Sequence, residues 1–445
     1  MKTNSFISNL TRSISFKFFL TGILSLFLLI PSAWIRSIII ERQLRQTEVL
    51  SEISSSWGNT QLMTGPVLTI PYKKYVEIDG KGTIQKEYAH FLPTDLNISG
   101  KIDPEIRYRG IFKVAVYNAD IQTKGSFDMP DVKKLGIEPE NAEFENAFIS
   151  VGISDMRGIK NNVSIKYNEN ELEAIPGVPV KDILSSGFHC KINLNELDNE
   201  QAKFIFNLSL NGSGSLRFFP VGQKTEVVIN SSWKDPDFQG EFLPVERNIS
   251  ESGFSAKWIV THLNRNFPQA WKNTEYSIEN TSFGVGLLIP AGHYQKAERS
   301  AKYAIMFIGL TFLLFLLIEV LNRKRLHPIQ YLLTGLSLSV FYALLISISE
   351  QIGFGYAYLI SSTAIILLIS FYIHSGFHNI GFTFITACVL SLLYGFLYII
   401  LQLQDYSLLF GSIGLFIVLG TFMFMTRKIN WYKEESIQDE GENKS

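Results

Sequence analysis

The stretch YAIMFIGLTFLLFLLIEVL, residues 303–321, is the first of five apolar runs that follow one another with only short polar segments between them. Each run approaches the ~20 residues that a helix needs to cross the hydrocarbon core of a bilayer. Helix is the expected form because lipid offers backbone amides no hydrogen-bond partner. A soluble core helix would show a polar face, which these runs lack. We therefore predict a block of five transmembrane helices at residues 303–321, 329–349, 354–373, 382–401 and 407–425.

Three acids lie in this block, namely Glu319, Glu350 and Asp405. Acids inside a membrane are costly and usually functional, so these three are the candidates for an ion or proton path. They fall near the ends of the runs, where water is expected to reach them, and the paired broken helices of transporters are missing. A transporter is therefore the alternative and not the preferred interpretation.

A sixth apolar run occupies residues 18–35. A cleaved signal peptide would need small residues before the cut, and Pro31-Ser32-Ala33 followed by the bulky Trp34 matches that pattern poorly. Beyond the run, apolar residues recur at near-helical spacing among charged ones, so we predict an uncleaved anchor whose helix continues out of the membrane. The apolar positions of this amphipathic continuation are Ile40, Leu44, Leu50, Ile53 and Trp57.

The region between the anchor and the block, residues 36–302, is rich in short alternating or β-branched runs broken by Gly, Pro, Asn and Asp, which is typical of strands. Residues 112–130 and 225–244 look alike and align Asp120 with Asp235. Two explanations stay open: a duplicated pair of sandwich-like units, or chance similarity of strand–turn–strand sequences. The predicted strands are residues 67–75, 112–117, 148–153, 204–210, 226–229, 258–263 and 285–289.

Composition and motifs argue against several classes of function. The net charge is -1 and no basic run with interleaved aromatic residues occurs, so nucleic acid is not expected as a partner. The two cysteines, Cys190 and Cys388, fall in the soluble region and in an apolar run, so no disulfide is predicted. No Walker loop, nucleophile elbow or dinucleotide fingerprint is present. We therefore expect no enzyme, no cofactor, no metal and no catalytic residues.

The most distinctive polar–aromatic group of the soluble region is Arg265, Pro268, Gln269 and Trp271. Tryptophan and arginine can anchor a recognition surface. The preferred interpretation is structural, because Asn266-Phe267-Pro268 is a turn signal and tryptophan often lies in a core.

Three histidines, His327, His374 and His378, are expected on the cytoplasmic side of the block. His374 and His378 could meet on one helical face, but Ser375 stands where a metalloprotease motif needs its glutamate, and Gly376 with Asn379 indicates a loop. Catalytic zinc also needs three protein ligands, so we interpret these histidines as interfacial.

Four long strings carry a family resemblance: SLRFFPVGQKTEVVINSSWKDPDFQGEFLP from Ser215, GFSAKWIVTHLNRNFPQAW from Gly253, FGVGLLIPAGHYQKAERSAKYAIMFIGLTFLLFLLIE from Phe283 and HPIQYLLTGLSLSVFYALLISISEQIGF from His327. They resemble the CreD-like inner-membrane proteins, also called cell envelope integrity proteins. The resemblance implies a bacterial protein of envelope maintenance and stress, with no established catalytic activity and no site residues to carry over. The family often has Pro-Val-Asp where this chain has Pro290-Ala291-Gly292-His293, which weakens any role for an acid there.

The predicted organisation has four parts: a cytoplasmic tail with the first transmembrane helix (1–35), an extracytoplasmic β-rich domain with a leading amphipathic helix (36–302), five transmembrane helices (303–426) and a cytoplasmic tail (427–445). Excess Lys and Arg mark the cytoplasmic side, so both termini are expected there. That side collects Lys2, Arg12, Lys17, Arg323, Lys324, Arg325, Arg427, Lys428, Lys433 and Lys444.

These observations predict a non-enzymatic integral inner-membrane protein that contributes to cell envelope integrity or the envelope stress response. Its periplasmic β domain would bind or sense an envelope protein or ligand of unknown identity, and its other partner is the lipid bilayer. The alternatives are a transporter and a membrane-bound enzyme acting on lipid or cell-wall precursors. Residues 58–295 are of ample size for a core, so we expect them to fold alone.

Overall fold

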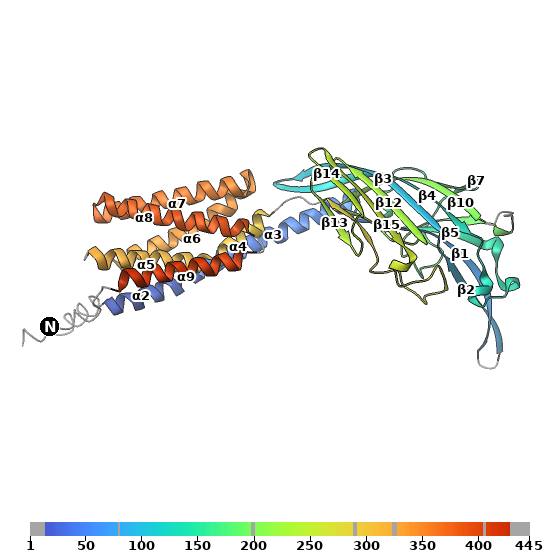
Figure 1. The fold of residues 1–445 in the computed structure, drawn as a ribbon, viewed down its shortest axis with the longest axis horizontal. Helices are drawn as coiled ribbons and strands as arrows, with labels where there is room; N and C mark the ends of the chain where they lie inside the picture. The colour runs from blue at the N-terminus through green and yellow to red at the C-terminus, as the bar shows by residue number, and fades with distance from the viewer. Residues whose placement is uncertain are drawn as a thin grey trace, which may run out of the picture. The chain divides into compact units, whose positions relative to one another are not determined.

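The computed structural model describes residues 14–78, 81–196, 201–287, 292–322, 327–403 and 406–427. The chain divides into two compact units. We call Met1–Arg45 with Ala291–Ser445 the membrane unit, and Gln46–Pro290 the β unit. Helix α3 (Leu29–Trp57) begins in the membrane unit and ends in the β unit, so the two units share one helix (Figure 1).

The described residues of the β unit form a nine-stranded and an eight-stranded sheet. The first, sheet A, has the order β13-β17-β11-β1-β5-β9-β8, with β2 paired to β1 and β16 paired to β2. The second, sheet B, has the order β14-β15-β12-β3-β4-β10-β6-β7. Sheet A comprises β1 (Gln61–Ile78), β2 (Lys81–Phe91), β5 (Ala147–Ile153), β8 (Ile175–Pro176), β9 (Gly187–Ile192), β11 (Ser215–Phe218), β13 (Pro236–Gly240), β16 (Ala270–Lys272) and β17 (Phe283–Leu287). Sheet B comprises β3 (Asp95–Arg109), β4 (Phe112–Asp128), β6 (Ser164–Tyr167), β7 (Asn170–Glu173), β10 (Gln201–Ser213), β12 (Lys224–Ser231), β14 (Glu246–Ser250) and β15 (Gly253–Thr261).

Buried side chains of both sheets form one hydrophobic core. Alternate residues along β10 and β12 are buried, as expected for strands that turn one face to a core. The rings of Phe188 on β9 and Phe206 on β10 meet edge to face with centroids 6.3 Å apart. Trp258 on β15 packs on Phe283 of β17, with centroids 5.9 Å apart. These contacts join sheet A to sheet B.

All seven predicted strand segments fall within or overlap strands, namely β1, β4, β5, β10, β12, β15 and β17. Of the two explanations left open for the likeness of residues 112–130 and 225–244, a pair of separately closed units is not formed, because buried residues of both sheets share one core. Asp120 lies inside β4, whereas Asp235 precedes β13, so the aligned residues occupy different structures. The physical reason is strand pairing, because β11 runs parallel to β1 in sheet A and β12 runs parallel to β3 in sheet B. Strands from the early and late parts of the domain are thus interleaved around one core.

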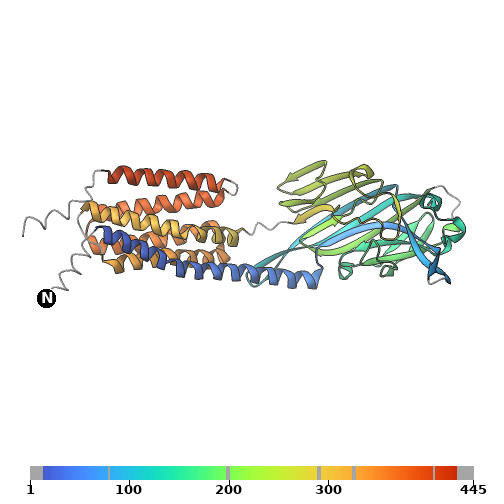
Figure 2. The ribbon, with the colours of Figure 1, turned by 90° about the horizontal axis from the view of Figure 1, so that it is seen from below.

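The membrane unit is helical, and α5 to α9 lie side by side in both views (Figures 1 and 2). Its other helices are α2 (Ile14–Phe27), α3 and α4 (His293–Lys302). The block itself comprises α5 (Ala304–Asn322), α6 (Pro328–Ile352), α7 (Phe354–Phe377), α8 (Ile380–Gln402) and α9 (Ser407–Thr426).

Four helical stretches among the described residues are long and apolar enough to cross a membrane, namely Phe19–Trp57, Pro328–Ile352, Phe354–Gly376 and Ile380–Gln402. Helix α4 and Ala304–Leu317, which meet at a bend of 47°, would make a fifth if they form one span. The apolar helix Leu408–Phe424 is shorter. An N-terminal apolar helix, a β-rich region and several C-terminal apolar helices are therefore confirmed, while the count of five C-terminal spans stays a prediction.

A fragment comprising Gln46–Pro290 should fold alone into a monodisperse β-rich protein, because this unit contains the whole shared core. Far-UV circular dichroism and size exclusion test this expectation. Trp258 is fully buried, so W258A should cost about 3–5 kcal/mol of the free energy of unfolding. Leu263 is largely exposed, so L263A should change that free energy by less than about 0.5 kcal/mol. A mainly helical spectrum, or aggregation of the unsubstituted fragment, would contradict the prediction.

Candidate functional site

Helix α3 ends in the β unit, where two serine hydroxyls and a glycine turn follow one another. The hydroxyls of Ser55 and Ser56 donate to the carbonyl of Glu52 at 2.9 and 3.1 Å, and the backbone nitrogen of Gly58 donates to the carbonyl of Ser54 at 2.8 Å. The bond from Gly58 satisfies one of the carbonyls that a helix end leaves open. Gly58 then turns the chain toward β1 with φ 142°. A Cβ at Gly58 would lie 2.7 Å from the carbonyl oxygen of Asn211, so only glycine fits between α3 and β10.

The carboxylate of Asp155 binds the residue that follows this turn. Its Oδ2 accepts from the backbone and side-chain nitrogens of Asn59 at 3.1 and 3.0 Å. Arg157 donates from Nη2 to Oδ2 at 2.7 Å and from Nε to Oδ1 at 2.9 Å. The side-chain hydrogen bonds from Arg157, together with backbone donors and against the effect of burial, lower the pKa of Asp155 to about 2. Asp155 is therefore a carboxylate at neutral pH.

The amide of Gln61 completes the arrangement and is 1% exposed. Its Nε2 donates to the carbonyls of Asp155 and Asn211 at 3.1 and 2.9 Å. Its Oε1 accepts from the backbone nitrogen of Asp155 at 3.3 Å and lies 3.2 Å from Oγ of Ser154. Both ends of the amide are satisfied, which fixes its position in a low-dielectric environment.

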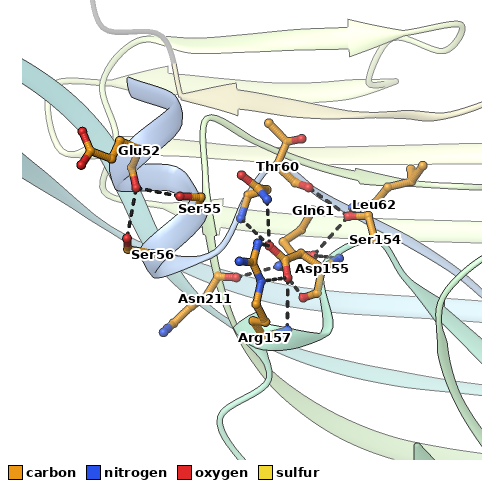
Figure 3. Close-up of polar contacts among 11 residues, drawn as sticks. Glu52, Ser55, Ser56, Thr60, Gln61, Leu62, Ser154, Asp155, Arg157 and Asn211 are labelled. Atoms are coloured by element: carbon orange, nitrogen blue, oxygen red, sulfur yellow. Dashed lines mark hydrogen bonds and ion pairs between the residues drawn. The ribbon is translucent and has the colours of Figure 1, made fainter. Parts of the chain in front are cut away.

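Figure 3 shows Gln61, Ser154, Asp155 and Arg157 converging beside the last turn of α3. We call these four residues, with Asn59 and Asn211, the junction cluster. Gln61 and Asn211 lie on β1 and β10, three residues follow β5, and Asn59 lies between α3 and β1. The cluster therefore connects the segment after α3 with strands of both sheets.

The hairpin of β3 and β4 holds the same end of α3 from another side. The Arg107 guanidinium lies 3.7 Å from the centroid of the Trp57 ring. Trp57 Nε1 donates to the carbonyl of Tyr117 at 3.3 Å, and Arg109 forms an ion pair with Glu52. The last turns of α3 are thus packed on sheet B as well as tied to the junction cluster.

A second polar cluster lies in the membrane unit around α4. The buried hydroxyl of Tyr294 donates to Oε1 of Glu350 at 2.8 Å, and Arg42 Nε lies 3.9 Å from the same oxygen. Glu298 pairs with Arg36 at 3.3 Å and with Lys302 at 3.1 Å. These contacts connect α4 to α3 and to the end of α6.

Glu319 and Glu350, the two acids of the block that the structure describes, were expected to be reached by water. Each is instead covered by a hydrogen-bond partner. Glu319 is 6% exposed, and Tyr331 on the next helix donates to its Oε2 at 3.1 Å. The ring of Tyr331 packs on Phe312 and Phe315, which brings the phenol over the acid. The Glu350 side chain is 11% exposed beneath Tyr294. Asp405 lies outside the described residues.

The Arg265 group has the structural role that the sequence favours. Arg265 is buried and donates from Nη1 to the carbonyl of Phe267 at 2.9 Å and to that of Pro268 at 3.3 Å. Burial lowers the pKa of Arg265 to about 10. Gln269 Nε2 donates to the carbonyl of Pro93 at 3.0 Å, and Trp271 lies in the core. Four side chains expected to form one turn therefore hold that turn against the sheets.

The histidines occupy helix ends. His327 caps α6, where its Nδ1 accepts from the backbone nitrogen of Ile329 at 3.3 Å. His374 lies in the last turn of α7, 3.2 Å from the hydroxyl of Thr383, and His378 follows that helix with φ 51°. Helix α7 continues through Gly376 to Phe377, so the loop predicted from Gly376 and Asn379 is confined to His378 and Asn379. Cys190 and Cys388 are both free.

The substitution D155N should lower the stability of the Gln46–Pro290 fragment by about 1–2 kcal/mol at pH 7, after allowing for solvent screening at the exposed Arg157. The folded pKa lies below the unfolded value, so the stabilisation is present above pH ~4 and is lost as the pH falls through 2. Thermal unfolding at pH 7 and at steps between pH 5 and 2 tests this, with a Tm decrease of ~2–8 °C expected at pH 7. Asp131, which also caps a 3-10 helix but is more exposed, provides the control D131N. A Tm difference between D155N and wild type that does not change with pH would contradict the role of the carboxylate charge.

Comparison with known proteins identifies the family of the chain. The family model described as "Inner membrane protein CreD" matches residues 13–432. The Inner membrane protein CreD of Escherichia coli (strain K12) is 33% identical over 413 residues, which cover 92% of this chain and 91% of that protein. The chain therefore belongs to the CreD family of inner membrane proteins.

Proposed function

We propose that this integral membrane protein is non-enzymatic, that it contributes to cell envelope integrity or to the envelope stress response, and that its β unit binds or senses a ligand or envelope protein outside the cytoplasmic membrane. The observation that carries the proposal is the junction cluster. Helix α3 has an apolar N-terminal part, and its last turns contact β3 and β4 through Arg109 and Tyr117. Just beyond the helix, Asp155 holds Asn59, and Gln61 at the start of β1 binds the carbonyls of Asp155 and Asn211. A binding event that shifts either sheet would therefore move the end of α3.

The β unit offers a recess of about 460 Å³ for such binding. Its aromatic residues are Tyr88, Phe148 and His189, with Phe148 in edge-on contact with each of the other two at centroid distances of 6.5 and 6.2 Å. The lining carries charges of both signs, because Lys191 is joined by Glu145, and Lys86 is paired with Glu143 at 2.8 Å. Aromatic rings beside charged groups of both signs suit a ligand with an apolar part and polar groups. We place the binding site of the β unit here.

We also propose six membrane spans with both termini in the cytoplasm. The four long apolar helices and the bent α4–α5 pair support five spans, and the shorter apolar helix in α9 would be the sixth. Lys and Arg concentrate in both tails and at residues 323–325, which an even number of spans places on one side.

A transporter is the second candidate, and one observation favours it. Glu319 is a buried acid in an apolar helix, and such acids often belong to ion or proton paths. Ion or proton flux into vesicles that contain the purified protein, compared with empty vesicles, separates this candidate from the first.

Inserting Gly-Ser-Gly after Gly58 should abolish function without loss of the protein from the membrane, because the insertion separates α3 from the junction cluster. The measurement is survival of cells that lack the chromosomal copy under a membrane-perturbing detergent, with the wild-type chain restoring survival. The same insertion after Gly82, where a Cβ would meet nothing within 4 Å, is the control and should restore survival. Full restoration by the Gly58 insertion would contradict coupling through α3.

A reporter enzyme that is active only in the cytoplasm should work when fused after Ser445. The same reporter inserted after Gly82 in the β unit should be inactive, because the proposed topology puts that unit on the side of the membrane opposite the cytoplasm. Activity of both fusions, or of the Gly82 insertion alone, would show that the proposed orientation is wrong.

A further inference from the structure

A groove of about 840 Å³ opens between α7 and α8 of the membrane unit. Tyr358 and Tyr394 form its buried part, and the Tyr358 hydroxyl donates to the carbonyl of Tyr394 at 2.7 Å. Small residues, Gly355 on α7 and Ser391 with Gly395 on α8, leave the space open. The complete lining is Ile352, Gly353, Phe354, Gly355, Tyr356, Tyr358, Leu359, Ser362, Thr363, Ile366, Ser391, Tyr394, Gly395 and Tyr398.

The length of the groove matches one leaflet of a bilayer. Its lining on α7 extends from Phe354 to Ile366, which corresponds to about 18 Å of helix at a rise of 1.5 Å per residue. One leaflet contributes ~15 Å of hydrocarbon. A single acyl chain lying along α7 would fill this length.

Two cations of α4 lie at one end of the groove. Lys296 Nζ is 5.7 Å from the ring centroid of Phe354, the first residue of α7, and donates to Oε1 of Gln402 at 2.9 Å. Gln402 follows Tyr398 by one helical turn, so it continues the α8 side of the groove. Arg299 Nη2 donates to the carbonyl of Leu403 at 3.3 Å. Among the described residues, the partners recorded for these two cations are neutral oxygens and not carboxylates.

We propose that this groove binds a membrane phospholipid with an anionic headgroup. The acyl chain would lie against Tyr358 and Tyr394, and the phosphate oxygens would replace or extend the neutral partners of Lys296 and Arg299. Any apolar groove in a membrane holds lipid tails, so the selective element is the charge at its end. This inference concerns the membrane unit and does not depend on what the β unit binds.

The test uses the full chain in nanodiscs made of equal amounts of phosphatidylglycerol and phosphatidylcholine, with native mass spectrometry of the lipid that stays bound. The wild type should retain phosphatidylglycerol in preference to phosphatidylcholine. A Cβ at Gly395 would meet nothing within 4 Å, so G395L should extend its side chain into the groove and remove most of the retained lipid of both kinds. The matched control is G411L on α9, where a Cβ is equally free, and it should retain lipid as the wild type does.

The charge is tested separately. K296Q and R299Q should each lower the preference for phosphatidylglycerol about fivefold, from ~1 kcal/mol per cation near an anionic lipid surface, while the total bound lipid is kept. K302Q removes a cation that pairs with Glu298 on the same helix, and it should leave the preference unchanged. These surface substitutions also keep the test decisive if G395L fails to elute as a folded protein in size exclusion. Three results would overturn the proposal: equal retention by wild type and folded G395L, an unchanged preference in K296Q and R299Q, or a groove occupied only in a two-copy complex.

Discussion

The hydrogen bonds of the buried Gln61 amide are the interaction that holds the segment after α3 between the two sheets. The Gln61 side chain bridges the loop after β5 and the backbone of β10, while its own backbone begins β1. At the same position, β1 starts its parallel pairing with β11, where Gln61 is the partner of Leu216. One side chain therefore joins the start of sheet A to the loop after β5 and to β10 of sheet B.

The stability of this arrangement depends on whether its buried polar groups have hydrogen-bond partners, and not on the number of hydrogen bonds. A hydrogen bond contributes about 0.5–1.5 kcal/mol net, whereas leaving a buried partner unsatisfied costs ~1–3 kcal/mol. The Gln61 amide has its partners on other elements, so its loss would leave the carbonyl of Asn211 on β10 and groups of the loop after β5 without a partner. The α4 cluster of the membrane unit follows the same rule, since Glu350 is held by Tyr294 and faced by Arg42.

Local patterns predicted much of this structure. The lengths of the apolar runs indicated the helices, alternation indicated the strands, and the turn signal at Asn266-Phe267-Pro268 indicated the role of Arg265. The junction cluster could not be found in this way, because Gln61 and Asp155 are brought together only by the pairing of β1 with β5. The likeness of residues 112–130 and 225–244 suggested two separate units, which are not formed. Here too strand pairing decides, because the parallel pairs interleave early and late strands around one core. Glu319 was expected to be exposed to water because it lies near the end of an apolar run. Tyr331 on the following helix covers it instead.

The central claim is that the junction cluster fixes the end of α3 to both sheets. Hydrogen–deuterium exchange of the full chain, with wild type compared with Q61L and with the control Q85L on the exposed part of β2, tests it most directly. The claim predicts that Q61L speeds exchange by about fivefold or more at the amides of Gly58, Asn59 and Leu62, as expected for a loss of ~1–3 kcal/mol, while the middle of β4 and β10 keeps its protection. Unchanged exchange at those three amides in Q61L, or the same change in Q85L, would contradict it.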